Sequence, residues 1–421
     1  MMEPNPPREP VPTAPHSRLG ARYWRLWSSS ALSNLADGVF KVALPLVAVG
    51  FTRSPALIAG LTFAMTLPWL LFALPAGALV DRLDRRQAMV TANSARAVLL
   101  AALALALMAG ANSIWALYVV ALCIGVAETV YDTSAQSILP QMVPRAQLSR
   151  ANGRLYAAEL TANEFVGPPL GGVLVTAGAA TALATPAGLW VVAAGTLLLV
   201  RGPFRVPRAH PTSLRSDIAE GVRFLWRHRL LRTLAIMTGV FNFASNAVFA
   251  IFVLYAVGPT SAMQLSEPAY GALLTTVAAG SVVGSLAAGW IERRLGRARS
   301  LAVAFLGGGV LLGAPGVTAE PLAIAAAFFV GGVGIVVANV IVVSLRQVIT
   351  PDRLLGRVNS GYRLFAWGSR PLGAATGGLL AEFVGLRPVF GIMAALTVAL
   401  LVGLRVVTDP AMDAAEREVE H

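Results

Sequence analysis

The stretch "SILPQMVPRAQLSRANG", residues 137–153, recurs as "SLRQVITPDRLLGRVNS" at residues 344–360, with a constant offset of 207 positions. A looser repeat pairs "GALVDRLDRR", which starts at Gly77, with "GWIERRLGRA", which starts at Gly289. Each repeated stretch is polar and lies between long apolar runs, at the same place in each half of the chain. The repeats therefore predict two halves of the same topology.

The composition is that of a membrane protein. Apolar residues make up 56% of the 421 residues and charged residues only 13%, against about 25% in soluble domains. A span needs about 20 apolar residues, and the apolar runs give twelve candidates, the one at 300–315 being the shortest. They lie at 24–50, 56–79, 88–109, 114–137, 153–178, 182–200, 232–256, 269–290, 300–315, 321–345, 360–383 and 388–406.

Basic residues fall almost entirely on one set of connections. The two tails and the even-numbered loops hold 27, whereas the odd-numbered loops hold only Arg53 and Arg387. This asymmetry predicts that both termini are cytoplasmic and that the protein lies in the inner (plasma) membrane. The arginine excess is explained by orientation and by contact with anionic lipid headgroups, so nucleic acid is not an expected partner.

The longest polar segment divides the spans six and six. We expect a cytoplasmic tail at 1–22, a helical bundle at 23–200, a linker at 201–231, a second bundle at 232–406 and a cytoplasmic tail at 407–421. Within the linker, "SLRSDIAEGVRFLW" has apolar residues on one helical face, which predicts an amphipathic helix on the inner membrane surface. A solvated connector is the alternative.

The chain resembles major facilitator superfamily transporters over essentially its whole length. "GALVDRLDRR" resembles the family's loop between the second and third helices, although Asp84 stands where that family has glycine. More narrowly, "LADGVFKVALPL" at 35–46 and the stretches that follow resemble bacterial drug, macrolide and siderophore exporters. The resemblance implies an all-α fold of twelve transmembrane helices in two pseudo-symmetric six-helix bundles, a monomer, and a gating latch at the loop. The matching loop residues are Gly77, Asp81, Arg82, Arg85 and Arg86.

A second motif lies in the fifth span. "GPPLGG", residues 167–172, resembles the antiporter motif of drug/proton exchangers through Gly167, Pro168, Gly171 and Gly172. Asn163 stands where the motif has an earlier glycine. Proline removes a backbone donor and bends a helix, so a packing kink is the alternative.

The energy source is predicted to be an ion gradient. Lys41 is the only lysine and follows Phe40, so the chain lacks the Gly-Lys-Ser/Thr of a phosphate-binding loop. The four histidines are scattered over the tails and the linker, which predicts no metal site, no cofactor and no enzymatic centre.

Charged residues within the spans are the main functional signal, since each costs roughly 2.5–3.5 kcal/mol at the bilayer centre. Glu128 and Asp132 share one helical face, and antiparallel packing predicts Glu159 and Glu164 at similar depths. Crowded carboxylates favour protonation, as proton coupling or substrate contact requires. The alternative is a structural role, with Arg96 or Arg370 as partner.

Asp37 and Lys41 are four residues apart, with the acid nearer the N-terminus, which favours a helical ion pair. Such a pair would keep Asp37 ionised and make it a poor proton carrier. The alternative is that Lys41 serves Glu128 or Asp132 instead.

In the second half, the substrate-cavity candidates are Asn242, Asn246, Phe249, Arg363 and Arg370. Hydrogen bonding between helices is the alternative for the two amides. Together these features predict proton-coupled export of a small amphipathic compound. An importer or symporter with the same fold is the main alternative, and a non-transporting receptor or assembly factor the least favoured one.

Overall fold

The protein is almost wholly helical. The computed structural model describes residues 19–80, 83–144, 147–202, 204 and 214–420. Ten helices in this part of the chain are long and apolar enough to cross a membrane. The chain is therefore an all-helical, multi-pass membrane protein, as the composition predicts.

The first half contains helices at each of the first six predicted runs. The fifth run is divided among two α-helices and a π-helical segment, which is why it does not count among the ten. The elements are α1 (Ala21–Val49), α2 (Pro55–Val80), α3 (Arg85–Met108), α4 (Ile114–Ile138), η1 (Leu139–Gln141), α5 (Leu148–Glu159), η3 (Leu160–Val166), α6 (Gly167–Thr176) and α7 (Ala179–Leu198).

The second half also has a helix at each predicted run. The ninth is longer than predicted, and the eleventh lies in α13, whose apolar part is interrupted by Arg363 and Arg370. The elements are α8 (Leu214–Arg227), α9 (Arg229–Ala256), α10 (Glu267–Leu295), α11 (Arg297–Val317), α12 (Pro321–Ile349), α13 (Asp352–Val384), α14 (Leu386–Ala399), η4 (Leu400–Arg405) and α15 (Asp409–Glu420).

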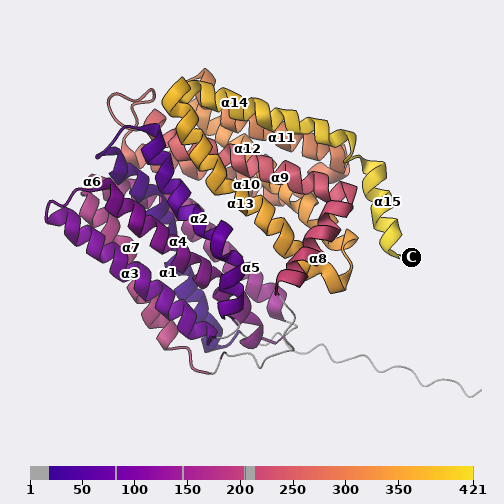
Figure 1. Cartoon of the computed structure of the whole chain (residues 1–421), viewed down its shortest axis with the longest axis horizontal. Helices are drawn as coiled ribbons and strands as arrows, with labels where there is room; N and C mark the ends of the chain where they lie inside the picture. Colours follow the sequence, from indigo (N-terminus) through magenta and orange to yellow (C-terminus); the bar gives the residue numbers. More distant parts are fainter. Residues whose placement is uncertain (1–18, 81–82, 145–146, 203, 205–213, 421) are drawn as a thin grey trace, which may run out of the picture.

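The helices form two groups that lie side by side (Figure 1). In the first group α1 packs on α6 and α7, and α3 packs on α4 and α7. In the second, α9 packs on α13, and α12 packs on α10 and α11. The groups meet where α2 contacts α13 and α6 contacts α10, while the ribbons of α5 and α8 stand apart on either side of the seam in Figure 1.

Glycines let the backbones approach closely at both seams between the two groups, the contact of α6 with α10 and the contact of α2 with α13. A Cβ on Gly172 of α6 would collide with the backbone of Glu267 at the start of α10, and a Cβ on Gly271 would collide with Pro168. Across the other seam, Gly378 of α13 lies against Pro55 at the start of α2. Because backbone meets backbone without intervening side chains, these ends of the two groups are closely joined.

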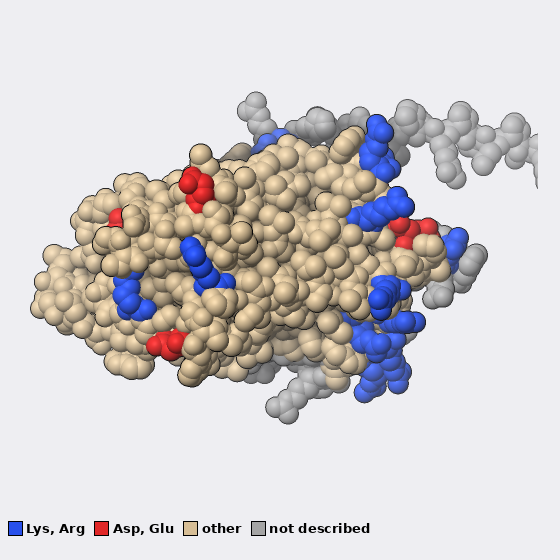
Figure 2. All heavy atoms as spheres, turned by 90° about the horizontal axis from the view of Figure 1, so that it is seen from above, with Lys and Arg blue, Asp and Glu red and all other residues tan. Residues whose placement is uncertain are grey.

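The opposite end of the molecule is basic. On the face shown in Figure 2, Lys and Arg side chains gather at the right-hand end, while most of this face is uncharged. There the predicted amphipathic helix forms as α8, which packs on α9 and α13. Glu220 of α8 pairs with Arg357 of α13, and Leu225 is fully buried.

The C-terminal helix α15 is fastened to the connection between α10 and α11, which is the second copy of the "GALVDRLDRR" stretch. Arg297 lies 3.2 Å from Glu292, 2.6 Å from Glu416 and 3.9 Å from Asp413. The carboxylate of Asp409 accepts a 2.9 Å hydrogen bond from the backbone N–H of Ala298. Arg297 thus adds polar contacts to the apolar packing of α15, whose Met412 is fully buried.

Replacing Arg297 should release α15. Partly exposed ion pairs of this kind contribute about 1 kcal/mol, so Arg297→Ala should raise amide hydrogen exchange in 409–420 about fivefold. Arg299→Ala, at an exposed position on the same connection, is the matched control. Unchanged exchange in Arg297→Ala would show that α15 is held by other contacts.

Candidate functional site

A buried ion pair joins α1 to α3. Arg96 Nη1 lies 2.7 Å from Asp37 Oδ1, and the side chains are 0% and 8% exposed. The guanidinium is also flanked by the rings of Tyr131 and Trp190, whose centroids lie 4.8 and 4.9 Å from its Cζ. Cation–π contact and charge pairing together stabilise an arginine that has no access to water, although its Nε has no hydrogen-bond partner among the described residues.

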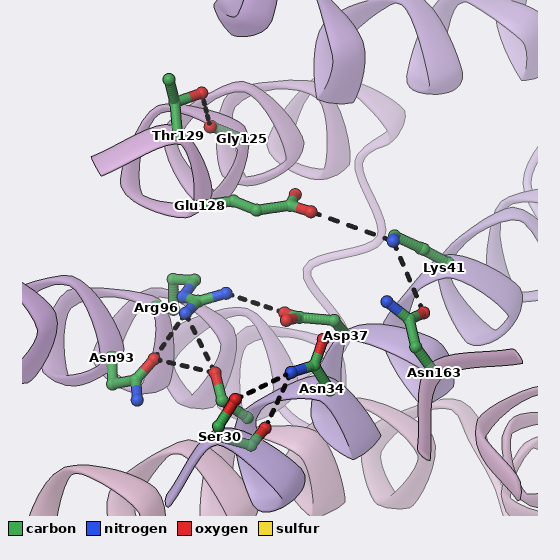
Figure 3. Close-up of polar contacts among 11 residues, drawn as sticks. Ser30, Asn34, Asp37, Lys41, Asn93, Arg96, Gly125, Glu128, Thr129 and Asn163 are labelled. Carbon is green, nitrogen blue, oxygen red and sulfur yellow. Dashed lines mark hydrogen bonds and ion pairs between the residues drawn. The ribbon is translucent and has the colours of Figure 1, made fainter. Parts of the chain in front are cut away.

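The expected helical pair between Asp37 and Lys41 is therefore wrong (Figure 3). Asp37 points towards α3 because the buried guanidinium of Arg96 needs an anion more than the half-exposed ammonium of Lys41 does. The second nitrogen of Arg96 donates to the side-chain oxygens of Ser33 and Asn93. Asp37 is thus committed to a structural network.

Lys41 turns to α4 and η3 instead. Its Nζ lies 3.9 Å from Glu128 Oε1 and donates across 3.5 Å to Asn163 Oδ1, as Figure 3 shows. The Lys41 side chain is 41% exposed, so it can move between partners. Asn163 is the residue that stands in place of the motif's glycine, and it provides the second contact.

Lys41 and Glu128 line a small hollow of about 90 Å³ between the two groups of helices. The second group contributes Trp367 and Arg370, both on α13. The hollow is large enough for a few water molecules or one polar group, and it lies where a bound molecule would touch both groups. The other lining residues are Met65, Thr66 and Trp69.

The remaining acids of the first half surround the same place. Lys41 lies within electrostatic reach of Glu164 and Asp132 as well as Glu128, and Glu159 is within reach of Lys41. The arginines of α13 face these acids across the seam.

Arg363 interacts electrostatically with Asp132, and Arg370 with Glu164 and Glu128. The acid surplus of one half is therefore partly offset by basic residues of the other. Among the described residues no acid of the first half lies within ion-pair distance of Arg363 or Arg370, so these opposite charges compensate each other without close contact.

The π-helical segment η3 positions two of these polar residues, Asn163 and Glu164. Pro168 and Pro169 lack the N–H groups that would continue α-helical bonding to residues four positions earlier. In a π-helix the bonds span five residues, which brings residues five apart, such as Glu159 and Glu164, nearer to one face. The backbone of Asn163 also rests on Gly38 of α1, where a Cβ would collide.

An aromatic and cationic cluster, whose arginines but not whose tryptophans were predicted from the sequence, bridges the two groups at the hollow. Trp69 of α2 and Trp367 of α13 meet edge to face with centroids 4.8 Å apart. Arg363 lies 4.3 Å and Arg370 5.2 Å from the Trp367 ring, and Arg363 donates to Gln136 of α4. The spacing of Arg363, Trp367 and Arg370 on one helical face could have revealed it.

The amide and aromatic candidates on α9 have a packing role instead of lining the hollow. Asn242 Nδ2 donates to the backbone carbonyl of Ala366 across 2.7 Å, and Asn246 Nδ2 donates to that of Asn242. Phe249 packs on Phe328, with ring centroids 5.6 Å apart. The alternative of interhelical hydrogen bonding therefore holds for Asn242, because the donor finds a carbonyl on the neighbouring helix.

Of the loop-motif residues, Asp81 and Arg82 lie outside the described residues, and Gly77 lies in α2. Arg85 donates to the backbone carbonyl of Ser137 near the end of α4. Arg86 donates to the carbonyls of Leu197 and Leu198 at the end of α7. Both arginines thus satisfy carbonyl groups at helix C-termini.

Asp84, the departure from the family pattern, begins α3. Its carboxylate accepts from the backbone N–H of Gln87 across 3.1 Å and from that of Phe204 across 3.0 Å. It is an N-cap that also fixes the chain beyond α7. Among the described residues no group of His, Cys, Asp and Glu could hold a metal ion.

Polar latches join the two groups at the end opposite α8 and α15. The carboxylate of Glu382 on α13 accepts from Ser54 Oγ across 2.8 Å and from the backbone N–H of Ala56 across 3.2 Å. Arg53 Nη1 donates to the carbonyl of Val257 across 3.2 Å. Arg53 is one of only two basic residues in the odd-numbered loops, and here it has a structural partner.

Comparison with known proteins decides the family. The model of the transmembrane secretion effector family of the major facilitator superfamily matches residues 13–421. The chain belongs to this family. It is therefore a secondary transporter, not an enzyme, and it moves a small-molecule substrate across a membrane.

Relatives and solved structures agree with this membership. The chain is 28% identical to the multidrug efflux pump Tap of Mycobacterium tuberculosis over 380 residues, which covers 86% of this chain and 87% of Tap. An uncharacterized MFS-type transporter of Sinorhizobium fredii is 28% identical over 367 residues, 84% of this chain and 86% of that protein.

The nucleoside transporter NupG has a similar fold, with a TM-score of 0.72 and 13% identity, over 92% of this chain and 99% of NupG. An inward-facing bacterial homologue of the iron transporter ferroportin has a TM-score of 0.69 and 16% identity, over 95% and 100%. At these identities the structures indicate the fold of the MFS and nothing about substrate.

Removing one partner of the buried pair should destabilise this MFS protein strongly. Arg96→Leu leaves the Asp37 carboxylate buried without its cation, which typically costs about 3–5 kcal/mol. Unfolding in detergent should show this loss, whereas Lys41→Met, at a half-exposed position, should lose much less. Equal losses in the two variants would contradict a structural role specific to Asp37 and Arg96.

The Glu382 latch should control separation of the two groups at its end of the molecule. In a Cys123→Ala background, Ala59→Cys places a thiol in the buried seam between α2 and α13. Adding Glu382→Ala should raise maleimide labelling of this thiol about fivefold, because lost hydrogen bonds of about 1 kcal/mol shift the opening equilibrium. Glu320→Ala, at an exposed site before α12, is the control, and unchanged labelling would show that the glycine seam suffices.

Proposed function

We propose that this MFS protein exports a small amphipathic compound, such as a drug, antibiotic or secondary metabolite, across the plasma membrane in exchange for protons. The observation that carries the proposal is the position of Lys41. It lies 3.9 Å from Glu128 and 3.5 Å from Asn163 in a hollow that both groups of helices line.

The architecture behind this proposal has twelve spans in two pseudo-symmetric bundles. The run α5–η3–α6 and the helix α13 join the ten apolar helices as spans five and eleven. Both termini and the basic connections, including α8 and α15, then lie in the cytoplasm, where arginines meet anionic headgroups. The protein acts as a monomer.

Exchange requires that a proton and the substrate compete for one group. Glu128 is suited to this, because its carboxylate is held by a loose pair with Lys41 instead of a close network like that of Asp37. A proton on Glu128 removes the attraction for Lys41, which then turns to Glu164. A polar or cationic group of the substrate competes with the proton for the same carboxylate.

The contacts that join the two groups at one end support access to the hollow at Lys41 from the opposite, cytoplasmic end. Glu382 and the glycine contacts hold the two groups together at the end away from α8. The hollow is then reached from the cytoplasmic side in this state, as an exporter needs when it takes up its substrate. The 28% identity to Tap, which is named a multidrug efflux pump, agrees with export.

Transport in proteoliposomes tests the proposal. Wild type should drive efflux of a fluorescent amphipathic dye when a pH gradient is imposed. Glu128→Gln and Glu164→Gln should lose gradient-driven flux at least tenfold but keep downhill dye counterflow, since neutral amides cannot release a proton.

Glu320→Gln, at an exposed position before α12, should behave as wild type. Indifference of wild-type flux to the pH gradient would exclude proton exchange. Dye uptake in the same direction as protons would favour the importer or symporter instead.

A further inference from the structure

A second and larger cavity lies away from the hollow at Lys41. It is a groove of about 630 Å³ between α1 and the run α5–η3, and it shares no lining residue with that hollow. Its walls are formed mainly by apolar side chains such as Leu32, Leu35 and Ala162. Trp24 and Val166, which also line it, are 42% and 46% exposed, so the groove opens on the outer surface of the helical bundle.

Among the described residues only one charged side chain lines this groove, and it is a cation. Arg154 lies with its Cζ 5.3 Å from the Trp24 ring. Trp27 Nε1 donates to the backbone carbonyl of Arg154 across 3.1 Å, which fixes α5 beside α1. Arg150, exposed and one turn earlier on α5, does not line the groove.

The polar and apolar parts of the groove are ordered along the helices. The arginine and both tryptophans lie near the N-terminal ends of α1 and α5, which meet where Tyr23 donates to the carbonyl of Ala151. The leucines, alanines and Val166 follow towards the middle of the spans. Tryptophan and arginine are the residues that membrane proteins place at the level of lipid headgroups, and the apolar walls continue at the depth of acyl chains.

We propose that this groove binds one anionic phospholipid, with its phosphate at Arg154 and an acyl chain along the walls formed by α1 and η3. No carboxylate of the described part of the chain lines the groove, so a cationic amphipath finds no partner among these residues. A zwitterionic lipid fills the apolar part equally well but lacks the net charge that Arg154 attracts. Each basic residue near the headgroups favours an anionic lipid by about fivefold.

Tryptophan quenching in nanodiscs tests this site. Phosphatidylcholine discs receive a minor fraction of phosphatidylglycerol or phosphatidylcholine with brominated chains, and the Trp24 contribution is the difference between wild type and Trp24→Phe. Brominated phosphatidylglycerol should quench Trp24 with about fivefold greater apparent affinity than brominated phosphatidylcholine.

Arg154→Gln should remove this preference, and Arg154→Lys should retain it, because the charge is what selects the lipid. Arg294→Gln is the matched control, since Arg294 lies over Trp290 at 6.0 Å in the other half and should leave the preference intact.

Equal quenching of Trp24 by the two lipids in wild type would overturn the proposal and indicate bulk lipid contact. A phosphatidylglycerol preference that survives Arg154→Gln would overturn the assignment of the phosphate to Arg154. The wild-type comparison needs no variant of Arg154, so it decides the matter even if Arg154→Gln fails to fold. No step of the test depends on transport.

Discussion

The ion pair between Asp37 and Arg96 is the interaction on which the rest of the site depends. A guanidinium with no exposure needs both charge and hydrogen-bond partners, and it takes Asp37 from α1 together with two aromatic rings. This fixes α1 against α3 and removes Asp37 from any exchangeable role. It also leaves Lys41, one turn further on, without its neighbouring acid. Lys41 therefore contacts α4 and η3, and the transport site that we propose is built around a movable cation.

Helix α1 carries two ion pairs of different character, the fixed pair of Asp37 with Arg96 and the loose pair of Lys41 with Glu128. The Asp37 pair is short and shielded from solvent, whereas the Lys41 pair with Glu128 is 3.9 Å long and 41% exposed on the lysine side. A loose pair beside the seam costs little to break. The closely packed glycine contacts and the Glu382 latch at the far end hold the two groups together.

Much of the fold could be predicted from the sequence because hydropathy and charge are local properties. Every predicted apolar run contains a helix, and the linker helix forms as α8. The residues that matter at the site, Lys41, Glu128 and Glu164, could be identified because charge within a span is costly. Asn242 and Phe249 do not line the hollow at Lys41, and residue type alone does not show which way a side chain faces. Trp69 was missed because an aromatic residue in an apolar run gives no signal by itself.

The sequence by itself determined that this chain is a polytopic membrane protein with repeated halves, that its spans carry an excess of acids in the first half, and that no ATP-binding loop is present. Only the tertiary structure decided which acid meets which base. Asp37 is four residues from Lys41 along the chain but pairs with Arg96 on a different helix, and this choice depends on burial, which no spacing rule contains. In the sequence, Asn163 is only a departure from the antiporter motif. In the folded chain its backbone lies against Gly38 and its side chain accepts a hydrogen bond from Lys41, because the backbones of α1 and η3 come into contact there.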